Sequence, residues 1–292
     1  MDRLLIVDGH AYAYRAFYAI RELRSPAGKP TNAIYGFVKM LEKMRATTGP
    51  THLMVVWDGG LSSARMAALP EYKAQRPEMP EDLRPQLDEI TAYLDAAGIA
   101  SYCGSGIEAD DYIACLARQA ADLGMNVIIA SSDKDFMQLV SARVGLLNPN
   151  DKSETIWTDE QVRAKAGVEP SQIVDWLSLM GDSVDNIRGV PGVGPKTATD
   201  LLKQFGSIEN LYRHLDGVKS ERLRGALRES ESVVQRNCEL VRLHEVACEF
   251  LADTLKPRVA NLARLRELFA QWGFRKMLAA VELATEKQAV LI

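Results

Sequence analysis

The 292-residue sequence predicts an α/β domain with a doubly wound, mostly parallel sheet over residues 1–170, followed by an all-helical domain over residues 171–292. Two observations support this prediction. In the first half, short aliphatic runs without polar alternation follow one another between stretches of helical periodicity, which is the pattern of strands buried on both faces. Beyond about residue 156 only helical patterns remain, so strands and later helices belong to different domains.

Three aliphatic runs carry the strand prediction, and each leads to an aspartate. The runs cover residues 4–7, 53–57 and 127–130, and they lead to Asp8, Asp58 and Asp133. Helical patterns in the first half cover residues 11–22, 32–46, 85–97 and 109–123; those in the second half cover 159–166, 170–180, 195–205, 207–214, 219–229, 231–243 and 261–272. Because ligands of doubly wound sheets bind beyond the carboxyl ends of the strands, the three aspartates mark the expected site.

The composition is that of a globular protein. There are 35 Lys and Arg against 39 Asp and Glu, a net charge of −4, and 47% of the residues are hydrophobic. No apolar run reaches the roughly 20 residues that span a bilayer, and the N-terminus lacks a secretory pattern. The four cysteines have no zinc-like spacing and are expected to be free thiols in a reducing compartment. We therefore expect a cytoplasmic protein that does not bind membranes.

Nine acidic residues are candidates for one functional site. Besides those after the strands, some open the helix predicted from residue 109, some flank Lys134, and some follow the helix that ends at Met180. The helix dipole favours acids in a first turn, but three acids within residues 108–111 exceed what capping needs. The full set is Asp8, Asp58, Glu108, Asp110, Asp111, Asp133, Asp135, Asp182 and Asp185.

Carboxylates gathered in one cleft would repel one another and raise their own pKa values unless cations neutralise them. Oxygen ligands of this kind favour Mg²⁺ or Mn²⁺ over zinc, and pairs of such ions serve the hydrolysis of phosphate esters. We therefore expect two Mg²⁺ ions as cofactors, with Mn²⁺ as a substitute. The 30 other acidic residues face 35 basic ones, a balance of +5 that favours a polyanionic partner.

A glycine-rich segment at residues 188–198, Arg-Gly-Val-Pro-Gly-Val-Gly-Pro-Lys-Thr-Ala, precedes a predicted helix. Pro195 suits the first turn of that helix, whose free N–H groups can face a phosphate, while Lys196 and Thr197 add a charge and a hydroxyl. The segment is not a Walker A loop, because no glycine directly precedes Lys196. It is a helix-hairpin-helix signature at about residues 179–206, which binds the phosphodiester backbone without reading bases.

Residues 70–82 interrupt the alternation of strands and helices. They contain three prolines and few apolar side chains, so they cannot lie in the core. We expect a long exposed excursion that carries Lys73 and Arg76. Loops of this length are more often functional than not.

Together these motifs resemble the 5′-nuclease family, which includes the amino-terminal 5′→3′ exonuclease domain of bacterial DNA polymerase I and, more distantly, flap endonucleases of phages and eukaryotes. The resemblance covers nearly the whole chain and none of the polymerase part, and whether the chain is free-standing or a fragment stays open. Its strongest pieces are Tyr-Lys-Ala-Gln-Arg-Pro at 72–77, Gly-Ile-Glu-Ala-Asp-Asp at 106–111, Asp-Lys-Asp at 133–135 and Met-Gly-Asp-Ser-Val-Asp-Asn at 180–186.

The resemblance implies a PIN-like 5′-nuclease fold and a role for each motif residue. The acids up to residue 111 would serve a first metal ion and the other four a second. The residues that would hold the scissile phosphate are Arg15, Lys73 and Arg76, and Tyr14 would stack on the terminal base. The remaining residues implied to contact DNA are Tyr72, Gly192, Val193, Gly194, Pro195, Lys196 and Thr197.

Two further features are implied by the resemblance alone. The excursion, at about residues 70–90, would be a helical arch that admits a free 5′ end. Backbone carbonyls of the hairpin would hold a K⁺ ion that bridges to DNA phosphate. The matching residues are Leu179, Met180, Arg188, Val190 and Val193.

The expected activity is that of a structure-selective 5′→3′ exonuclease and flap endonuclease in DNA replication and repair, acting at the nucleoid on 5′ flaps, nicks and free 5′ ends. We expect a monomer; a polymerase or ligase partner stays open. One alternative is a PIN-type endoribonuclease, although such domains are usually shorter and lack the hairpin. Another is a non-catalytic DNA-junction binder, against which the complete set of acids argues. A haloacid-type phosphatase would need a second acid soon after Asp8, where Gly9 and His10 stand.

Overall fold

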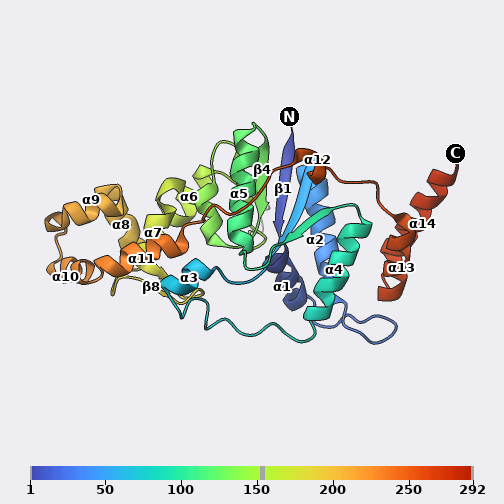
Figure 1. The fold of residues 1–292 in the computed structure, drawn as a ribbon, viewed down its shortest axis with the longest axis horizontal. Helices are drawn as coiled ribbons and strands as arrows, with labels where there is room; N and C mark the ends of the chain where they lie inside the picture. The colour runs from blue at the N-terminus through green and yellow to red at the C-terminus, as the bar shows by residue number, and fades with distance from the viewer. Residues whose placement is uncertain (1, 152–154, 291–292) are drawn as a thin grey trace.

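The predicted strands form the centre of the molecule in this computed structural model, which describes residues 2–151 and 155–290 (Figure 1). A six-stranded sheet has the order β3-β2-β1-β4-β5-β6, and every neighbouring pair is parallel except β5 with β6. The mostly parallel sheet is thus confirmed, with three short outer strands that lack the long aliphatic runs on which the prediction relied. The strands are β1 Arg3–Asp8, β2 His52–Trp57, β3 Ala100–Cys103, β4 Asn126–Ala130, β5 Val144–Leu147 and β6 Ile156–Trp157.

The central strands are buried on both faces, as their aliphatic runs require. On one face, Ile6 of β1 packs in the same core as α5, and on the other face Val7 packs in the core that holds α1, α2 and α4. Both side chains are fully buried. The two cores bring the helices onto opposite faces of the sheet, which is the doubly wound arrangement. The helices are α1 Gly9–Ala19, α2 Asn32–Thr48, α4 Arg84–Ala96 and α5 Ala109–Asp122.

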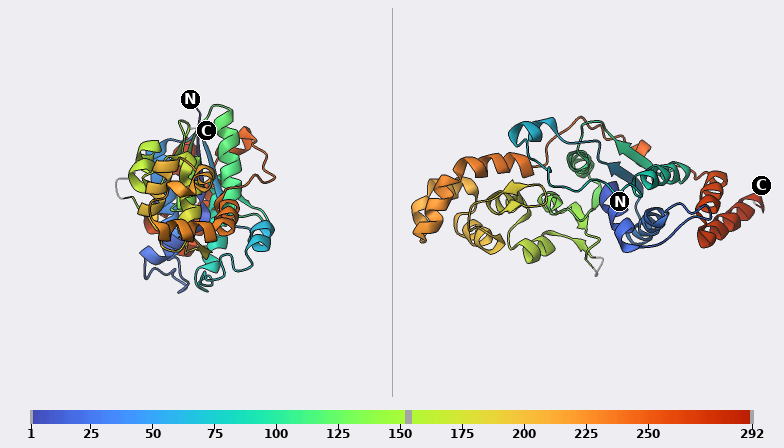
Figure 2. Two further views of the ribbon diagram at one scale, coloured as in Figure 1. Left: turned by 90° about the vertical axis from the view of Figure 1, so that its left-hand side faces the viewer. Right: turned by 90° about the horizontal axis from the view of Figure 1, so that it is seen from below.

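The chain from α6 to α11 forms a helical part at one end of the molecule (Figure 2). A two-stranded antiparallel hairpin, β7 Gly181–Asp182 and β8 Ile187–Arg188, interrupts the helices there and was not expected from the sequence. None of the helices in residues 2–151 and 155–290 has the length and hydrophobicity needed to cross a membrane. The helices of this part are α6 Asp159–Ala166, η2 Pro170–Gln172, α7 Ile173–Met180, α8 Pro195–Phe205, α9 Ile208–Arg213, η3 Leu215–Gly217, α10 Glu221–Glu229 and α11 Glu231–Val241.

The chain then returns to the sheet, which the sequence did not predict. After α11 it passes through α12 (Ala252–Leu255) to α13 (Leu262–Trp272) and α14 (Arg275–Val290), which lie at the opposite end from α8–α11 (Figure 1). Phe269 of α13 packs against Tyr93 of α4, and the indole N–H of Trp272 donates to Glu89 at 3.1 Å. The last helices therefore belong to the core beneath α2 and α4 rather than to the helical part.

The excursion runs below the carboxyl edge of the sheet, between α3 (Ser63–Ala68) and α4 (Figure 1). Residues 69–83 form turns and extended segments, and no helix forms among them. Of the arch implied at about residues 70–90, residues 70–83 form an excursion without a helix, and residues 84–90 belong to α4. The prolines at 70, 77 and 80 account for this, because each removes a backbone donor and clashes with a preceding helical turn.

Burial of the central strand predicts a large effect of truncation. Ile6→Ala leaves a cavity in a fully buried position and should lower the free energy of unfolding by about 2–5 kcal/mol in a denaturant titration. Leu123→Ala is the control, because Leu123 is 70% exposed and its removal should change stability by about 0.5 kcal/mol or less. Equal losses in the two variants would contradict this account of the core.

Candidate metal centre and its surroundings

The aspartates that follow the central strands meet at one edge of the sheet. Asp8 ends β1 and caps α1, where its carboxylate accepts the N–H of Ala11 at 3.0 Å and the hydroxyl of Ser131 at 2.8 Å. Asp133 lies just beyond β4 and caps the 3₁₀ helix η1 (Lys134–Leu139), accepting the N–H of Asp135 at 2.9 Å. Parallel strands end at the same edge, so each capping role also aims a carboxylate at a common point.

Two other segments add acids to this edge. The start of α5 supplies Glu108, whose side chain is 1% exposed, and Asp110 in the first turn. The hairpin β7–β8 supplies Asp182 and Asp185, both buried, from the helical part of the chain. The site is therefore built where the two parts of the molecule meet.

Burial and the neighbouring charges raise the pKa values of several of these acids. Burial, and after it the charges of Asp133 and Asp58, raise the pKa of Asp8 to about 6. The pKa values of Asp110 and Asp135 lie well above the ordinary aspartate value, again through burial first and then through Asp133. Eight of the nine predicted acids are connected in this way, and we call them the acid cluster: Asp8, Asp58, Glu108, Asp110, Asp133, Asp135, Asp182 and Asp185.

Basic side chains offset part of this charge. Lys73, which is buried, forms an ion pair with Glu108 and lies 4.0 Å from Asp110. Two of the basic side chains, Lys73 and Arg76, come from the excursion, and Lys134 follows Asp133 directly at the start of η1. The pairs are Lys73 with Glu108, Arg76 with Asp185 at 2.6 Å, and Lys134 with Asp182 at 3.1 Å.

The backbone of the excursion also forms hydrogen bonds that hold it to the β7–β8 hairpin. Lys73 adopts a left-handed conformation with φ of 57°, which is uncommon for a residue with a side chain, and its N–H donates to the carbonyl of Asp185 at 3.0 Å. Asn186 has φ of 59°, and its amide donates to the carbonyl of Glu71 at 2.8 Å. These contacts hold the backbone where the Lys73 side chain enters the acid cluster.

Two predicted site residues have other partners in the structure. Both carboxylate oxygens of Asp111 pair with the guanidinium of Arg65, at 2.6 and 2.8 Å, and one also accepts the N–H of His244 at 2.9 Å. Asp111 is therefore held by partners outside the acid cluster, and its expected role as a metal ligand stays a prediction. Tyr72 is 3% exposed, and its hydroxyl donates to Glu108 or Asp185, at 3.2 and 3.3 Å. The excursion that was expected to be exposed is therefore buried at Tyr72, which packs in the core of the sheet and α5, and the expected contact of Tyr72 with DNA stays a prediction.

The acid cluster fits hard divalent cations by its chemistry. All of its donors are oxygens, and Oδ1 of Asp135 is buried without a hydrogen-bond partner. Within the described ranges, no three acidic, histidine or cysteine side chains are already arranged as a complete metal-binding set. Lys73, Arg76 and Lys134 hold several of the carboxylates instead, so metal binding requires that these ion pairs rearrange.

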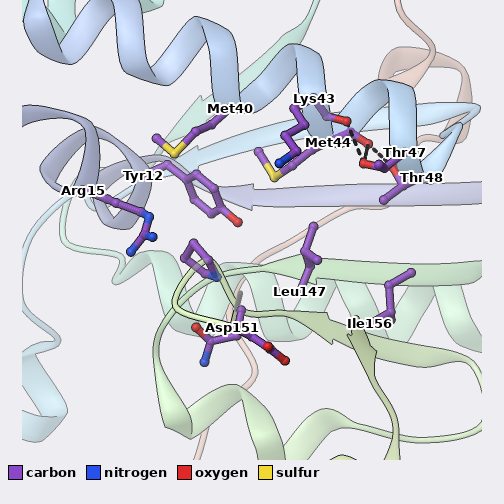
Figure 3. Close-up of a pocket in the computed structure, with 12 residues that line it drawn as sticks. Tyr12, Arg15, Met40, Lys43, Met44, Thr47, Thr48, Leu147, Asp151 and Ile156 are labelled. Atoms are coloured by element: carbon purple, nitrogen blue, oxygen red, sulfur yellow. Dashed lines mark hydrogen bonds between the residues drawn. The ribbon is translucent and has the colours of Figure 1, made fainter. Parts of the chain in front are cut away.

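The outer face of α1 carries the predicted contacts with the DNA end. Tyr14 is half-buried and stacks on the exposed ring of Tyr18, with ring centroids 6.3 Å apart. Arg15 donates to the side chain of Asn150 and lines a cavity of about 400 Å³ between α1, α2 and the chain from β5 to β6 (Figure 3). The structure thus leaves Tyr14 accessible but does not bring Arg15 to the acids.

The hairpin of residues 189–194 presents backbone to solvent beside β7–β8. Gly192 has φ of 82°, and a side chain at Gly192 or Gly194 would meet no atom within 4 Å, so both glycines border open space. Val193 is buried and anchors the turn, whereas Lys196 is exposed at the start of α8. Of the expected K⁺ ligands, the carbonyls of Leu179, Arg188 and Val190 accept hydrogen bonds from Val190, Asn237 and Val193.

Two family models match consecutive parts of this chain. The model described as "5′-3′ exonuclease, N-terminal resolvase-like domain" matches residues 3–167, and the one described as "5′-3′ exonuclease, C-terminal SAM fold" matches residues 168–262. The chain belongs to the 5′-3′ exonuclease family. The family resemblance read from the motifs is thereby confirmed, together with the succession of an α/β part and a helical part.

Relatives of this 5′-3′ exonuclease family member differ in length. A 5′-3′ exonuclease of Aquifex aeolicus is 38% identical over 283 residues, which make up 97% of this chain and 96% of that protein. DNA polymerase I of Bacillus caldotenax is 37% identical over 98% of this chain, which spans only 33% of the polymerase. A structure of the bacteriophage T5 D15 flap endonuclease in a complex with DNA and metal ions is 22% identical, with a TM-score of 0.68 over 97% of this chain and 99% of that one, and it confirms the fold.

Several residues of the site were missed in the sequence. Lys134 could have been found, because it stands between two predicted acids and its side chain reaches Asp182 at 3.1 Å. Tyr18 follows Tyr14 by one helical turn, which is a detectable pattern for stacked rings. Arg65 and Ser131 carry no such signal, because their partners are distant in the sequence.

The raised pKa values predict how the metal-free protein responds to pH. Because the folded pKa of Asp8 is about 6, above its usual 3.8, its contribution to stability is fully present below pH 3.8 and is lost as the pH rises through 6. In EDTA, the thermal midpoint should therefore fall as the pH rises from about 4 to about 6.5. Asp135→Asn removes one repelling charge and should make this fall smaller, whereas Asp122→Asn, an exposed acid of the same protein, should not. A midpoint that rises over this range would refute the description.

Proposed function

We propose that this chain is a Mg²⁺-dependent, structure-selective 5′→3′ exonuclease and flap endonuclease that cuts DNA near 5′ flaps, nicks and free 5′ ends in the cytoplasm. The convergence of the acid cluster beside Lys73 and Arg76, next to a backbone hairpin suited to phosphate, carries the proposal. Membership of the 5′-3′ exonuclease family and the likeness to a flap endonuclease in complex with DNA and metal ions support it.

The acid cluster offers oxygen ligands for two Mg²⁺ ions, which Mn²⁺ could replace. The acids that the strands and α5 supply, namely Asp8, Asp58, Glu108 and Asp110, would hold one ion. The acids of η1 and of the β7–β8 hairpin, namely Asp133, Asp135, Asp182 and Asp185, would hold the other. When bound, such ions supply activated water and stabilise the leaving oxygen of a phosphate ester.

Lys73 and Arg76 would change partners when the metal ions bind. In the structure Lys73 pairs with Glu108 and Arg76 pairs with Asp185, so both side chains already lie next to the acid cluster. Once other cations neutralise those acids, both side chains become available for the negative charge that develops on a phosphate in the transition state. Tyr14 and Tyr18, stacked on the exposed face of α1, would receive the terminal base, and Arg15 would swing from Asn150 to the phosphate.

The hairpin of residues 189–194 and the first turn of α8 would hold the DNA duplex next to the cleavage site. The first turn of α8 has N–H groups without intrahelical partners, and Lys196 adds a positive charge next to them. Carbonyls at Leu179, Met180, Arg188, Val190 and Val193 would hold the K⁺ ion. Each carbonyl oxygen has two lone pairs, so those already in hydrogen bonds keep an acceptor site.

Removal of one acid should separate turnover from binding. Asp133→Asn or Asp182→Asn should lower the rate on a 5′-labelled flap substrate in Mg²⁺ by at least about 100-fold, because one ligand charge is lost where transition-state charge develops. DNA affinity should change little. EDTA should abolish cleavage by the native protein, and an RNA substrate of the same shape should be cut poorly. An equal loss of rate and affinity would contradict the role of these acids.

Removal of the positive charge of Lys196 should weaken DNA binding rather than turnover. Lys196→Ala should weaken binding of flap DNA at every sequence and reduce the slope of log affinity against log salt by about 1, as expected for the loss of one phosphate contact. Lys203→Ala, at the other end of α8 and also exposed, is the matched control and should leave the slope unchanged. Identical slopes in the two variants would exclude the first turn of α8 from the DNA contact.

A further inference from the structure

Arg65 is the most completely paired charged side chain near the site, and the motifs give it no role. It lies in the short helix α3, beside the excursion, and is only 3% exposed. Its guanidinium forms a two-pronged ion pair with Asp111 and lies 3.4 Å from Oε1 of Glu108. It also donates to the carbonyls of Leu240 and Arg242, both at 2.9 Å.

These contacts join three separate segments. Arg65 itself comes from the segment between β2 and the excursion, Asp111 from the first turn of α5, and the two carbonyls from the end of α11 (Figure 1). The carbonyls at a helix C-terminus lack intrahelical partners and carry negative partial charge, so a guanidinium is favoured there. Arg65 thus connects the acid-bearing end of α5 to a helix of the helical part.

Helix α11 also contacts the strand β8, which leads into the hairpin of residues 189–194. Asn237 lies one turn before the end of α11, is fully buried, and donates to the carbonyl of Arg188 at 2.8 Å and to that of Ser178 at 3.1 Å. Arg188 ends β8, directly before the hairpin glycines. A continuous set of contacts therefore runs from the hairpin through α11 and Arg65 to Glu108.

Only a guanidinium can make all of these contacts at once. Arginine presents five N–H donors in a planar fork, whereas a lysine has a single ammonium that could meet one side of Asp111 but not both carbonyls as well. Glu108 would then keep its contact with Lys73 but lose the guanidinium next to Oε1. A lysine at position 65 would therefore keep the net charge of the site but change its geometry.

We propose that Arg65 is a positioning residue that sets the distance between the DNA-anchoring hairpin and the acid cluster, and thereby determines which phosphodiester bond is cut. The inference rests on the proposed nuclease function, since it concerns where that reaction takes place. It also gives Asp111 a role, as the carboxylate that orients Arg65.

The test is cleavage of a 5′-labelled flap with product lengths resolved to one nucleotide. Arg65→Lys should lower kcat by about 100-fold, as expected for a displacement of the order of 1 Å, and leave KM nearly unchanged. Its products should spread over neighbouring positions. Arg163→Lys is the control, because Arg163 pairs only with exposed acids of the surface, Asp159 and Glu169, and should give native rate and lengths.

A second variant covers the case in which Arg65→Lys does not fold. Asn237→Ala removes the contact of α11 with Arg188 and changes no acid, and it should also spread the products while the dependence of the rate on Mg²⁺ stays native. Thermal unfolding identifies folded variants. A folded variant of either kind that cuts at the native position overturns the inference, even if it is slower, because a weakened metal site loses rate without moving the cut. Absence of cleavage by the native protein would instead refute the proposed function.

Discussion

The concentration of negative charge at one buried edge of the sheet is the constraint on which this structure depends. Carboxylates that lose water and face one another favour their protonated forms, and the pKa of Asp8 is raised to about 6 for that reason. Such a group persists only with opposing charge. In this molecule the charge comes from the excursion and from η1, through Lys73, Arg76 and Lys134.

This demand for countercharge also explains the position of the excursion. A proline-rich segment with few apolar side chains gains little by packing, yet residues 72–76 lie against the hairpin. Ion pairs with Glu108 and Asp185 fix it there, together with the backbone N–H of Lys73 and the side-chain amide of Asn186, which donates to the carbonyl of Glu71. Lys73 and Arg76, which stabilise the acids here, are also the cations that we propose contact the phosphate, so one set of side chains would serve stability and chemistry in turn.

The site also depends on contact between the two parts of the chain. The sheet and α5 supply some of the acids, and the β7–β8 hairpin supplies Asp182 and Asp185. A buried arginine joins these parts next to the acids, where its removal would leave Asp111 without its partner. Buried contacts thereby join the segment proposed to anchor DNA to the acid cluster proposed to bind the metal ions.

The sequence by itself determined the central strands, most helices, the glycine-rich turn of residues 189–194 and the acids that follow the strands. These features depend on local periodicity, on glycine and proline, and on the rule that parallel strands end at one edge. Tertiary structure alone decided that Asp111 pairs with Arg65, that Tyr72 is buried among the acids, and that α13 packs beneath α4. Arg65 and Leu240 are 175 positions apart, and no local pattern specifies a contact between residues so distant. Such partners are selected by burial and charge only once the two parts of the chain have met.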